Sequence, residues 1–233
     1  MRSTRHILAV TTVVVVGALA GFLGYQSAQH PRGPASPLTV VDATMPPLSG
    51  PDPVVPGQPA VPDTLPDLTM PDITGQQKSL RDYLGHPLIV NFWATWCGPC
   101  RREIPLLQQL RAAYHNDGLE IIGIAVDFQK AVADYVAKTP ISYPLLIGED
   151  QGMAAAQKFG MEPVLPFSAF ADAQGRIIAV KVGELHKDEA DYILQEMRSI
   201  AAGKSSMADA RAAIADRLRE LSVARAKAGD KDS

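Results

Sequence analysis

The chain has 233 residues, 46% of them hydrophobic and 20% charged, and a formal net charge of −3 at pH 7. This composition excludes a wholly disordered chain and also a protein that crosses a membrane many times. Because there is no basic excess to neutralise a phosphate backbone, nucleic acid is not expected as a partner.

The N-terminal segment is strongly apolar. Residues 7–25 (ILAVTTVVVVGALAGFLGY) contain no charged side chain, and as a helix they would rise about 28 Å, close to the ~30 Å thickness of membrane hydrocarbon. We therefore expect residues 1–30 to form a signal anchor that stays attached. A cleaved signal peptide is the alternative, with residues 18–20 (ALA) as the exit. Arg2 and Arg5 precede the run, so the positive-inside rule places the N-terminus in the cytoplasm and the rest of the chain outside, and a cleaved signal peptide would also export the rest of the chain.

Residues 31–64 are expected to form an extended tether. Twelve of the nineteen prolines lie between residues 31 and 71. Each proline removes a backbone donor and fixes φ, so neither a helix nor a central strand tolerates this density. A polyproline-like spacer is the main interpretation, and a docking site for a proline-reading partner is the alternative. A globular domain is expected at residues 65–203.

The globular part alternates between strand and helix patterns. Largely apolar runs at 88–93 (LIVNFW) and 119–126 (LEIIGIAV) predict two buried strands, and residues 98–115 place apolar side chains on one helix face. The remaining elements are expected at helices 129–138, 151–159 and 187–202, a short strand 144–147, and a hairpin of strands 168–171 and 177–182. This order predicts an α/β fold with a mixed sheet and helices on both of its faces.

Residues 204–233 are expected to form a C-terminal helical extension. Ser206 can cap this helix, with Asp209 three residues later. The apolar residues of the helix fall on one narrow stripe: Met207, Ile214, Leu218 and Leu221. We expect the helix to pack across the surface of the domain, and a contact between two copies of the chain is the alternative.

The two cysteines of the chain, Cys97 and Cys100, stand together in the stretch 93–100 (WATWCGPC). Cys97 would lie just before a helix, where unsatisfied N–H groups and the positive end of the dipole favour a thiolate. Cys97 is therefore expected to attack a disulfide, and the shielded Cys100 to resolve the mixed disulfide. Pro99 fits the first helical turn, where the N–H that it lacks would be unpaired in any case.

Other roles for the cysteine pair fit the sequence less well. A zinc site would need a second cysteine pair, and c-type haem attachment would need a histidine where Arg101 stands. An inert structural disulfide needs neither a helix N-terminus nor two flanking tryptophans. The pattern thus predicts redox chemistry by a Cys97–Cys100 dithiol, with no metal and no further cofactor.

The stretch 91–105 (NFWATWCGPCRREIP) resembles the active site of thioredoxin-fold proteins, and more closely that of the membrane-anchored, exported TlpA/ResA-like thiol–disulfide oxidoreductases. The resemblance covers about residues 65–202, from PDLTMPD at 66–72 to the closing helix. It implies a thioredoxin fold and electron exchange with exported protein thiols or disulfides, with a membrane thiol carrier as the electron donor. The segment after Gly203 is not part of it.

The resemblance also implies further site residues. Pro166 matches the cis-proline that faces the two cysteines in such proteins. Leu165, in the stretch 163–166 (PVLP), stands where a small or β-branched residue is common, so it is expected to change the substrate preference. The expected substrate contacts are Trp96, Gly98, Pro99 and Leu165.

Glu103 is the expected proton acceptor for Cys100. Thioredoxins carry a buried acid in the strand before the motif, and here that position is Asn91, which cannot take a proton. Glu103 follows Cys100 by about one helical turn, within reach of it, and matches an acid of the exported branch. Burial would raise its pKa toward the working range. The alternative is a solvated charge on a polar turn.

Five other residues receive a structural interpretation only. Pro105 removes the helical bond to Arg101 and is expected to kink the helix just past the motif. His86 and His186 are expected at the surface, His115 at a helix end, and Asp127 in a turn after a strand. No site is assigned to them.

The direction of electron flow is inferred from the dipeptide between the cysteines. Gly-Pro is the thioredoxin choice, and thioredoxin lies at about −270 mV against about −120 mV for the oxidant DsbA, so a reductant is expected. Its substrates could be cysteines of cytochrome c precursors, of a copper-site assembly protein or of a disulfide isomerase. The alternatives are a disulfide-forming oxidant, a redoxin-type peroxidase, for which a third cysteine and its loop motif are missing, and a non-catalytic binding module.

Overall fold

The computed structural model describes residues 61–162 and 164–229. The predicted anchor at 7–25, the predicted tether up to residue 60 and Pro163 lie outside these ranges. Among the helices within them, none is both long and apolar enough to cross a membrane.

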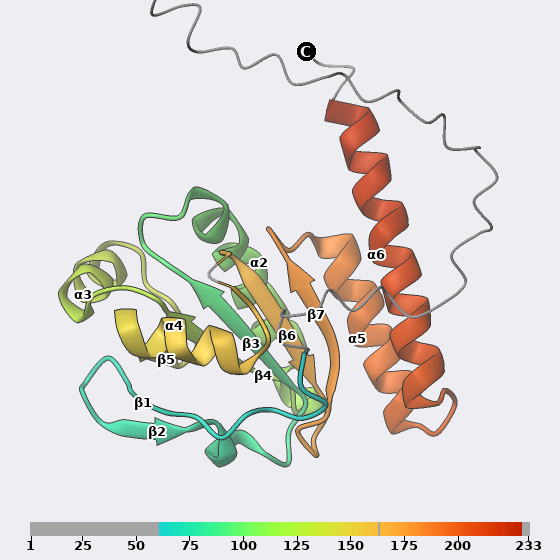
Figure 1. Cartoon of the computed structure of the whole chain (residues 1–233), viewed down its shortest axis with the longest axis horizontal. Coiled ribbons are helices and arrows are strands. Elements are labelled where there is room, and N and C mark those ends of the chain that lie inside the picture. Colours follow the sequence, from blue (N-terminus) through green and yellow to red (C-terminus); the bar gives the residue numbers. More distant parts are fainter. Residues whose placement is uncertain (1–60, 163, 230–233) are drawn as a thin grey trace, which may run out of the picture. The chain divides into compact units, whose positions relative to one another are not determined.

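A five-stranded sheet forms the centre of the described part (Figure 1). Its strand order is β5-β4-β3-β6-β7, in which β3, β4 and β5 run parallel while β6 and β7 run antiparallel to their neighbours. The strands are β3 (Leu88–Trp93), β4 (Glu120–Ala125), β5 (Leu145–Ile147), β6 (Phe167–Ala171) and β7 (Ile177–Val182). The mixed sheet predicted from the sequence is confirmed. Every residue of β3, the central strand, is buried, as expected for a largely apolar strand covered on both faces, and the buried residues include the polar Asn91.

Two apolar clusters fill the two faces of the sheet. One cluster joins the sheet to α2 (Gly98–Tyr114), α3 (Gln129–Lys138) and α5 (Lys187–Ala201), and the other joins it to α4 (Glu149–Lys158) and to β1 (Thr69–Pro71). β1 pairs antiparallel with β2 (Gln77–Ser79) in a small separate sheet. The predicted elements match these within about two residues at most ends.

Two short 3-10 turns, η1 (Leu80–Tyr83) and η2 (His115–Asp117), were not predicted. η1 begins at a capping box, in which the Ser79 hydroxyl accepts from the Arg81 N–H and the Asp82 carboxylate accepts from the Ser79 N–H. α2 continues through Pro105 to Tyr114, so this proline does not end the helix. The kink at Pro105 stays a prediction.

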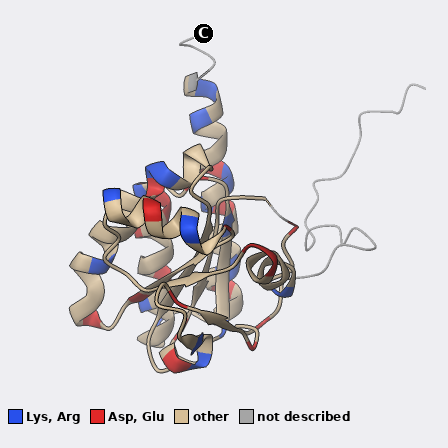
Figure 2. Cartoon of the chain, turned by 90° about the vertical axis from the view of Figure 1, so that its left-hand side faces the viewer, with Lys and Arg blue, Asp and Glu red and all other residues tan. Residues whose placement is uncertain are grey.

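The C-terminal helix α6 (Met207–Gly229) packs along α5 and β7, as Figure 1 shows for the red and orange helices. Its own residues Ala210 and Ile214 are buried. Arg211 donates from its guanidinium to the backbone oxygen of Ile177 in β7, at 2.5 Å from Nη2 and 3.1 Å from Nε. Packing of this helix across the domain, the main interpretation from the sequence, is confirmed. Lys and Arg alternate with Asp and Glu over the helices in Figure 2.

Candidate active site

Cys97 and Cys100 form a disulfide at the N-terminus of α2, with their Cα atoms 5.3 Å apart. Cys97 is the N-cap residue, and its Sγ accepts a hydrogen bond of 3.2 Å from the Cys100 N–H. Cys97 is 6% exposed and Cys100 is fully buried. Cys100 is therefore the more shielded of the two cysteines, as predicted, and the difference is small. The helix begins where the motif predicts it, with Gly98 and Pro99 in the first turn.

The segment that leads into Cys97 is fixed by Asp127, just after β4. Asp127 is buried, and its Oδ2 accepts from the Thr95 N–H at 3.0 Å and from the Thr95 hydroxyl at 2.6 Å. Its Oδ1 accepts from the Phe128 N–H at 2.8 Å. Sequence reasoning gave Asp127 a turn position but no link to the motif. The available signal was its place at the carboxyl end of a strand parallel to the one that precedes the cysteines.

Several apolar side chains that neighbour the site residues in sequence are exposed to solvent. Trp96, directly before Cys97, is 69% exposed, and Phe128, directly after Asp127, is 62% exposed. Val164, close before Pro166, is also exposed. Leu165 is only half-buried and packs against both apolar clusters. Of the expected substrate contacts, only Trp96 is well exposed, while Gly98, Pro99 and Leu165 are half-buried. Phe128 is a second exposed aromatic side chain, which the sequence did not suggest.

The peptide bond between Leu165 and Pro166 is cis, as the resemblance implied. The carbonyl oxygen of Pro166 accepts a hydrogen bond of 2.8 Å from the N–H of Gly183. Gly183 has φ +83°, in the left-handed region that favours glycine. It opens the segment between β7 and α5, residues 183–186, which we call the 183–186 loop.

Glu103 lies on α2, three residues after Cys100, and is only 2% exposed. Its Oε1 accepts from the Asn91 side-chain amide and its Oε2 from the backbone N–H of Leu185, both at 2.7 Å. The Asn91 amide also donates to the Ser168 hydroxyl at 3.1 Å. The alternative interpretation of Glu103 as a solvated charge is therefore wrong.

Burial raises the pKa of Glu103 from 4.5 to about 7. The hydrogen bonds from Leu185 and Asn91 favour the ionised form and oppose this change. The negative charge of Glu184 raises the pKa further, and the positive charge of Lys181 lowers it. The buried carboxyl thus has the pKa range expected for it from the sequence, with only neutral groups in direct hydrogen bonds.

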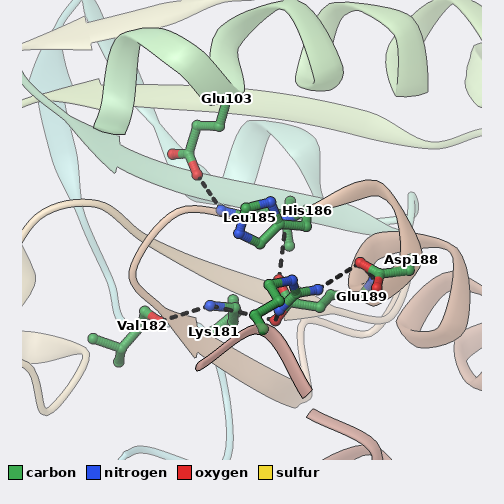
Figure 3. Close-up of polar contacts among 8 residues, drawn as sticks. Glu103, Lys181, Val182, Leu185, His186, Asp188 and Glu189 are labelled. Carbon is green, nitrogen blue, oxygen red and sulfur yellow. Dashed lines mark hydrogen bonds and ion pairs between the residues drawn. The ribbon is translucent and has the colours of Figure 1, made fainter. Parts of the chain in front are cut away.

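The 183–186 loop connects Glu103 to the start of α5. Leu185 binds Glu103 through its N–H, and the His186 N–H donates to the carboxylate of Glu189 at 3.0 Å (Figure 3). On the outside of the loop, Glu184 accepts from Arg102 at 2.9 Å from Nε and 2.5 Å from Nη2. The loop is therefore held at several points, and His186 is part of a helix start rather than an isolated surface residue.

Metal ligation has no support in the described ranges, where no group of three or more His, Cys, Asp or Glu side chains could hold an ion. His115 lies in η2, with Nδ1 3.2 Å from Glu120 Oε1. The cysteine pair remains the chemical centre of the site.

Known proteins resemble this chain in sequence and in fold. The model of the AhpC/TSA family matches residues 61–180. The chain belongs to this family. It is 32% identical over 124 residues to the thiol-disulfide oxidoreductase ResA of Bacillus anthracis and 33% identical over 126 residues to that of Geobacillus thermodenitrificans (strain NG80-2). Each match covers 53% of this chain and 70% of the relative.

Solved structures of proteins named for thiol–disulfide exchange are similar to this chain in fold. A thiol:disulfide interchange protein from Chlorobium tepidum TLS is 31% identical, with a TM-score of 0.51 over 58% of this chain and 96% of its own. A secreted thiol-disulfide isomerase from Corynebacterium glutamicum is 27% identical, with a TM-score of 0.50 over 54% and 80%. The chain is thus a ResA-like thiol–disulfide oxidoreductase with a thioredoxin-like fold. The family match ends within β7, before α5 and α6.

Proposed function

We propose that this oxidoreductase is an exported protein-disulfide reductase in which Cys97 attacks, Cys100 resolves and Glu103 accepts the proton of Cys100. The observation that carries the proposal is the carboxyl of Glu103. It is buried, follows Cys100 by about one turn of the same helix, and has a pKa of about 7. A base with a pKa near the working pH is well matched to accepting a thiol proton.

The first step is attack by the reduced protein on a substrate disulfide. The Cys97 thiolate, favoured at the N-terminus of α2, forms a bond to one substrate sulfur. The substrate S–S bond breaks, and its other sulfur leaves as a thiolate that takes up a proton from solvent. Cys97 is then joined to the substrate in a mixed disulfide.

The second step is resolution by Cys100. The Cys100 thiol gives its proton to the Glu103 carboxylate, and the resulting thiolate attacks the sulfur of Cys97. The Cys97–Cys100 bond forms, the mixed disulfide breaks, and the second substrate sulfur leaves as a thiolate. In total the substrate gains two electrons and the protein dithiol loses two, which gives the disulfide form seen in the structure.

A reductant must restore the dithiol after each turnover. We assign this role to the dithiol of a membrane thiol carrier, which would attack the Cys97–Cys100 disulfide and become oxidised itself. The Gly98-Pro99 dipeptide supports the reducing direction, because it is the thioredoxin choice. The substrates are then disulfides of exported proteins, which dock against the exposed ring of Trp96. Leu165, beside cis-Pro166, influences which substrates are preferred.

We place this activity on the periplasmic side of a bacterial inner membrane, with residues 7–25 as a single span and residues 31–64 as the tether. The apolar length of 7–25 and the proline content that follows it support the assignment. A similar solved structure is that of a secreted protein. Mass spectrometry of the membrane fraction tests it: an intact N-terminus is expected, and a mature N-terminus near residues 20–30 would exclude the anchor.

The catalytic proposal is tested by the reduction potential of the Cys97–Cys100 couple, together with insulin reduction by dithiothreitol. A potential near that of thioredoxin and catalysis lost in Cys97→Ser are expected. A potential near that of DsbA would instead favour the oxidant. Insulin reduction that persists in Cys97→Ser would exclude the dithiol mechanism. Cys100→Ser should accumulate mixed disulfides, which identifies the substrates.

A further inference from the structure

We infer that Arg225, near the end of α6, is a positioning residue for the active site: through the buried carboxylate of Glu189 it holds the 183–186 loop, and with it the Leu185 N–H that binds Glu103. The inference rests on the proposed role of Glu103. It gives α6, which lies beyond the family match, a part in the chemistry.

The first link is an ion pair between α6 and the start of α5. Arg225 Nη1 donates to Glu189 Oε1 at 2.7 Å, and Arg225 Nη2 donates to Asp188 Oδ1 at 2.6 Å. The planar guanidinium thus bridges two neighbouring carboxylates with two separate nitrogens, which a lysine cannot do in the same geometry. Glu189 is only 1% exposed, so its charge depends on protein groups for compensation.

The second link runs from Glu189 into the loop. Glu189 Oε2 accepts from the His186 N–H at 3.0 Å, the residue directly after Leu185 (Figure 3). Lys181 Nζ is the other cation near this carboxylate, 3.6 Å from Oε1, and it donates to the Val182 carbonyl at 2.9 Å. Arg225 is therefore the closer of the two cations, and it provides the direct charged hydrogen bond.

The third link is the loop itself, which reaches two proposed site residues. The Leu185 N–H donates to Glu103 at 2.7 Å, and the Gly183 N–H donates to the carbonyl of Pro166 at 2.8 Å. Glu103, Pro166 and Glu189 are thus bound by three backbone N–H groups within four consecutive residues. A shift of the loop start or end would change the hydrogen bonding of Glu103.

Loss of the Arg225 cation would disturb this chain of contacts at the end that lies farthest from Glu103. A buried carboxylate without its cation moves toward water, and this movement weakens its bond to His186. If Leu185 then withdraws, Glu103 loses a donor that favours its ionised form, and its pKa rises. Besides the two thiols of the reduced chain, the ionisable groups that face Glu103 are Tyr143, Lys181 and Glu184, and the substitution leaves all of these groups in place.

The test is stopped-flow reaction of the full reduced chain with 5,5′-dithiobis(2-nitrobenzoate). The first thionitrobenzoate released reports attack by Cys97, and the second reports resolution by Cys100. In Arg225→Gln we expect the pH midpoint of the second phase to move upward by about one unit, with the first phase unchanged. Arg217→Gln is the matched control, because Arg217 lies on the same helix and pairs with the exposed Glu220.

Two further variants separate positioning from general loss of fold. Arg225→Gln combined with Glu189→Gln removes the buried charge together with its partner and keeps an acceptor for His186, so the pH midpoint should return toward that of the parent. Arg225→Lys should restore it only in part. A melting temperature recorded for each variant identifies any that is unfolded at the assay temperature. If Arg225→Gln is unfolded, Arg225→Lys carries the test, because its pH midpoint should still lie above that of the parent.

The outcomes distinguish this inference from the function on which it rests. If Glu103→Gln resolves at the parent rate, the role of Glu103 fails, whatever Arg225 does. If Glu103→Gln slows the second phase but the midpoint in Arg225→Gln equals that of Arg217→Gln, the proposed function stands and the inference about α6 is wrong. A midpoint that moves in Arg225→Gln and fails to return in the double variant would also contradict it.

Discussion

Two carboxylates of almost equal burial lie on either side of the 183–186 loop, and their surroundings differ. Glu103 is bound by two neutral donors, the Asn91 amide and the Leu185 N–H. Glu189 is bound by one neutral donor, the His186 N–H, and by the guanidinium of Arg225, with Lys181 near. Burial alone therefore does not decide what a carboxyl group does in this molecule. The charge of its partners does.

The difference follows from the energetics of desolvation. Burial disfavours the charged form of a carboxyl group, and neutral donors offset only part of that effect, so Glu103 reaches a pKa of about 7 and can exchange a proton near neutral pH. A cation in direct contact compensates the charge and also fixes the geometry of both side chains. Glu103 is therefore suited to proton exchange, and Glu189 to holding the 183–186 loop. Each role can be tested by removing the group on which it depends: the carboxyl of Glu103 in one case and the Arg225 cation beside Glu189 in the other.

The largest expected effect follows from removing the base. Glu103→Gln keeps the size of the side chain and an acceptor for Leu185 but cannot take a proton. General-base assistance is worth about 10² to 10⁴ in rate, so resolution of mixed disulfides should slow by at least about ten-fold. The second phase of thionitrobenzoate release measures this, and alkylation of Cys97 by iodoacetamide should persist. Glu149→Gln, at an exposed carboxylate of α4, serves as the control.

The next largest effect is on stability, at the other carboxylate. Arg225→Gln leaves the Glu189 charge buried with only Lys181 nearby, and breaking a buried ion pair in this way costs about 3–5 kcal/mol. Urea unfolding of the oxidised chain at pH 7.5 measures the loss. Arg217→Gln should change the free energy of unfolding far less, because its pair is exposed. Equal losses in both variants would remove the distinction between the buried and exposed pairs.

A third prediction concerns the pH dependence of stability. The pKa of Glu103 is about 7 in the fold and 4.5 as an ordinary value, so between these pH values the folded state holds a proton that the unfolded state has lost. This contribution is fully present below pH 4.5 and is lost as the pH rises through 7, by about 3 kcal/mol in total. Urea unfolding at several pH values should show the decline in the parent. In Glu103→Gln the decline from this group should vanish, and an unchanged slope would mean that Glu103 does not titrate in this range.

The smallest effect tests the long-range charges. Glu184 raises the pKa of Glu103, so Glu184→Gln should lower the pH midpoint of the resolution phase by about 0.3 unit at low salt. Because part of this interaction passes through solvent, the shift should shrink in 1 M salt. A midpoint that moves upward instead would show that the pairing of Glu184 with Arg102, rather than its charge, dominates.

The sequence predicted the features whose signals are local. The largely apolar strand β3 and the cysteine pair at the start of α2 were predicted from short stretches of chain, and the cis bond before Pro166 was implied by the resemblance to a known family. Glu103 was found because its distance from Cys100 along one helix is itself a sequence property. Its burial and raised pKa agree with the prediction, and its role in proton transfer stays a proposal.

The contacts that were missed join residues far apart in the chain. Thr95 and Asp127 are 32 residues apart, and Glu189 and Arg225 are 36 residues apart. A charged residue on an amphipathic helix has the same sequence signal whether it meets solvent or a buried carboxylate. Only the packing of α6 along α5 decides that Arg225 meets Glu189, and no local pattern encodes that arrangement.

The Asp127 carboxylate affects the surface that a partner protein would contact. Because Thr95 and Phe128 are bound to the same carboxylate, the backbone at the two exposed aromatic residues, Trp96 directly after Thr95 and Phe128 itself, is braced as one unit and not as two independent loops. Preorganised aromatic side chains lose little conformational entropy when they are covered. A partner protein that covers these rings would therefore meet a surface whose backbone is already fixed in the free protein.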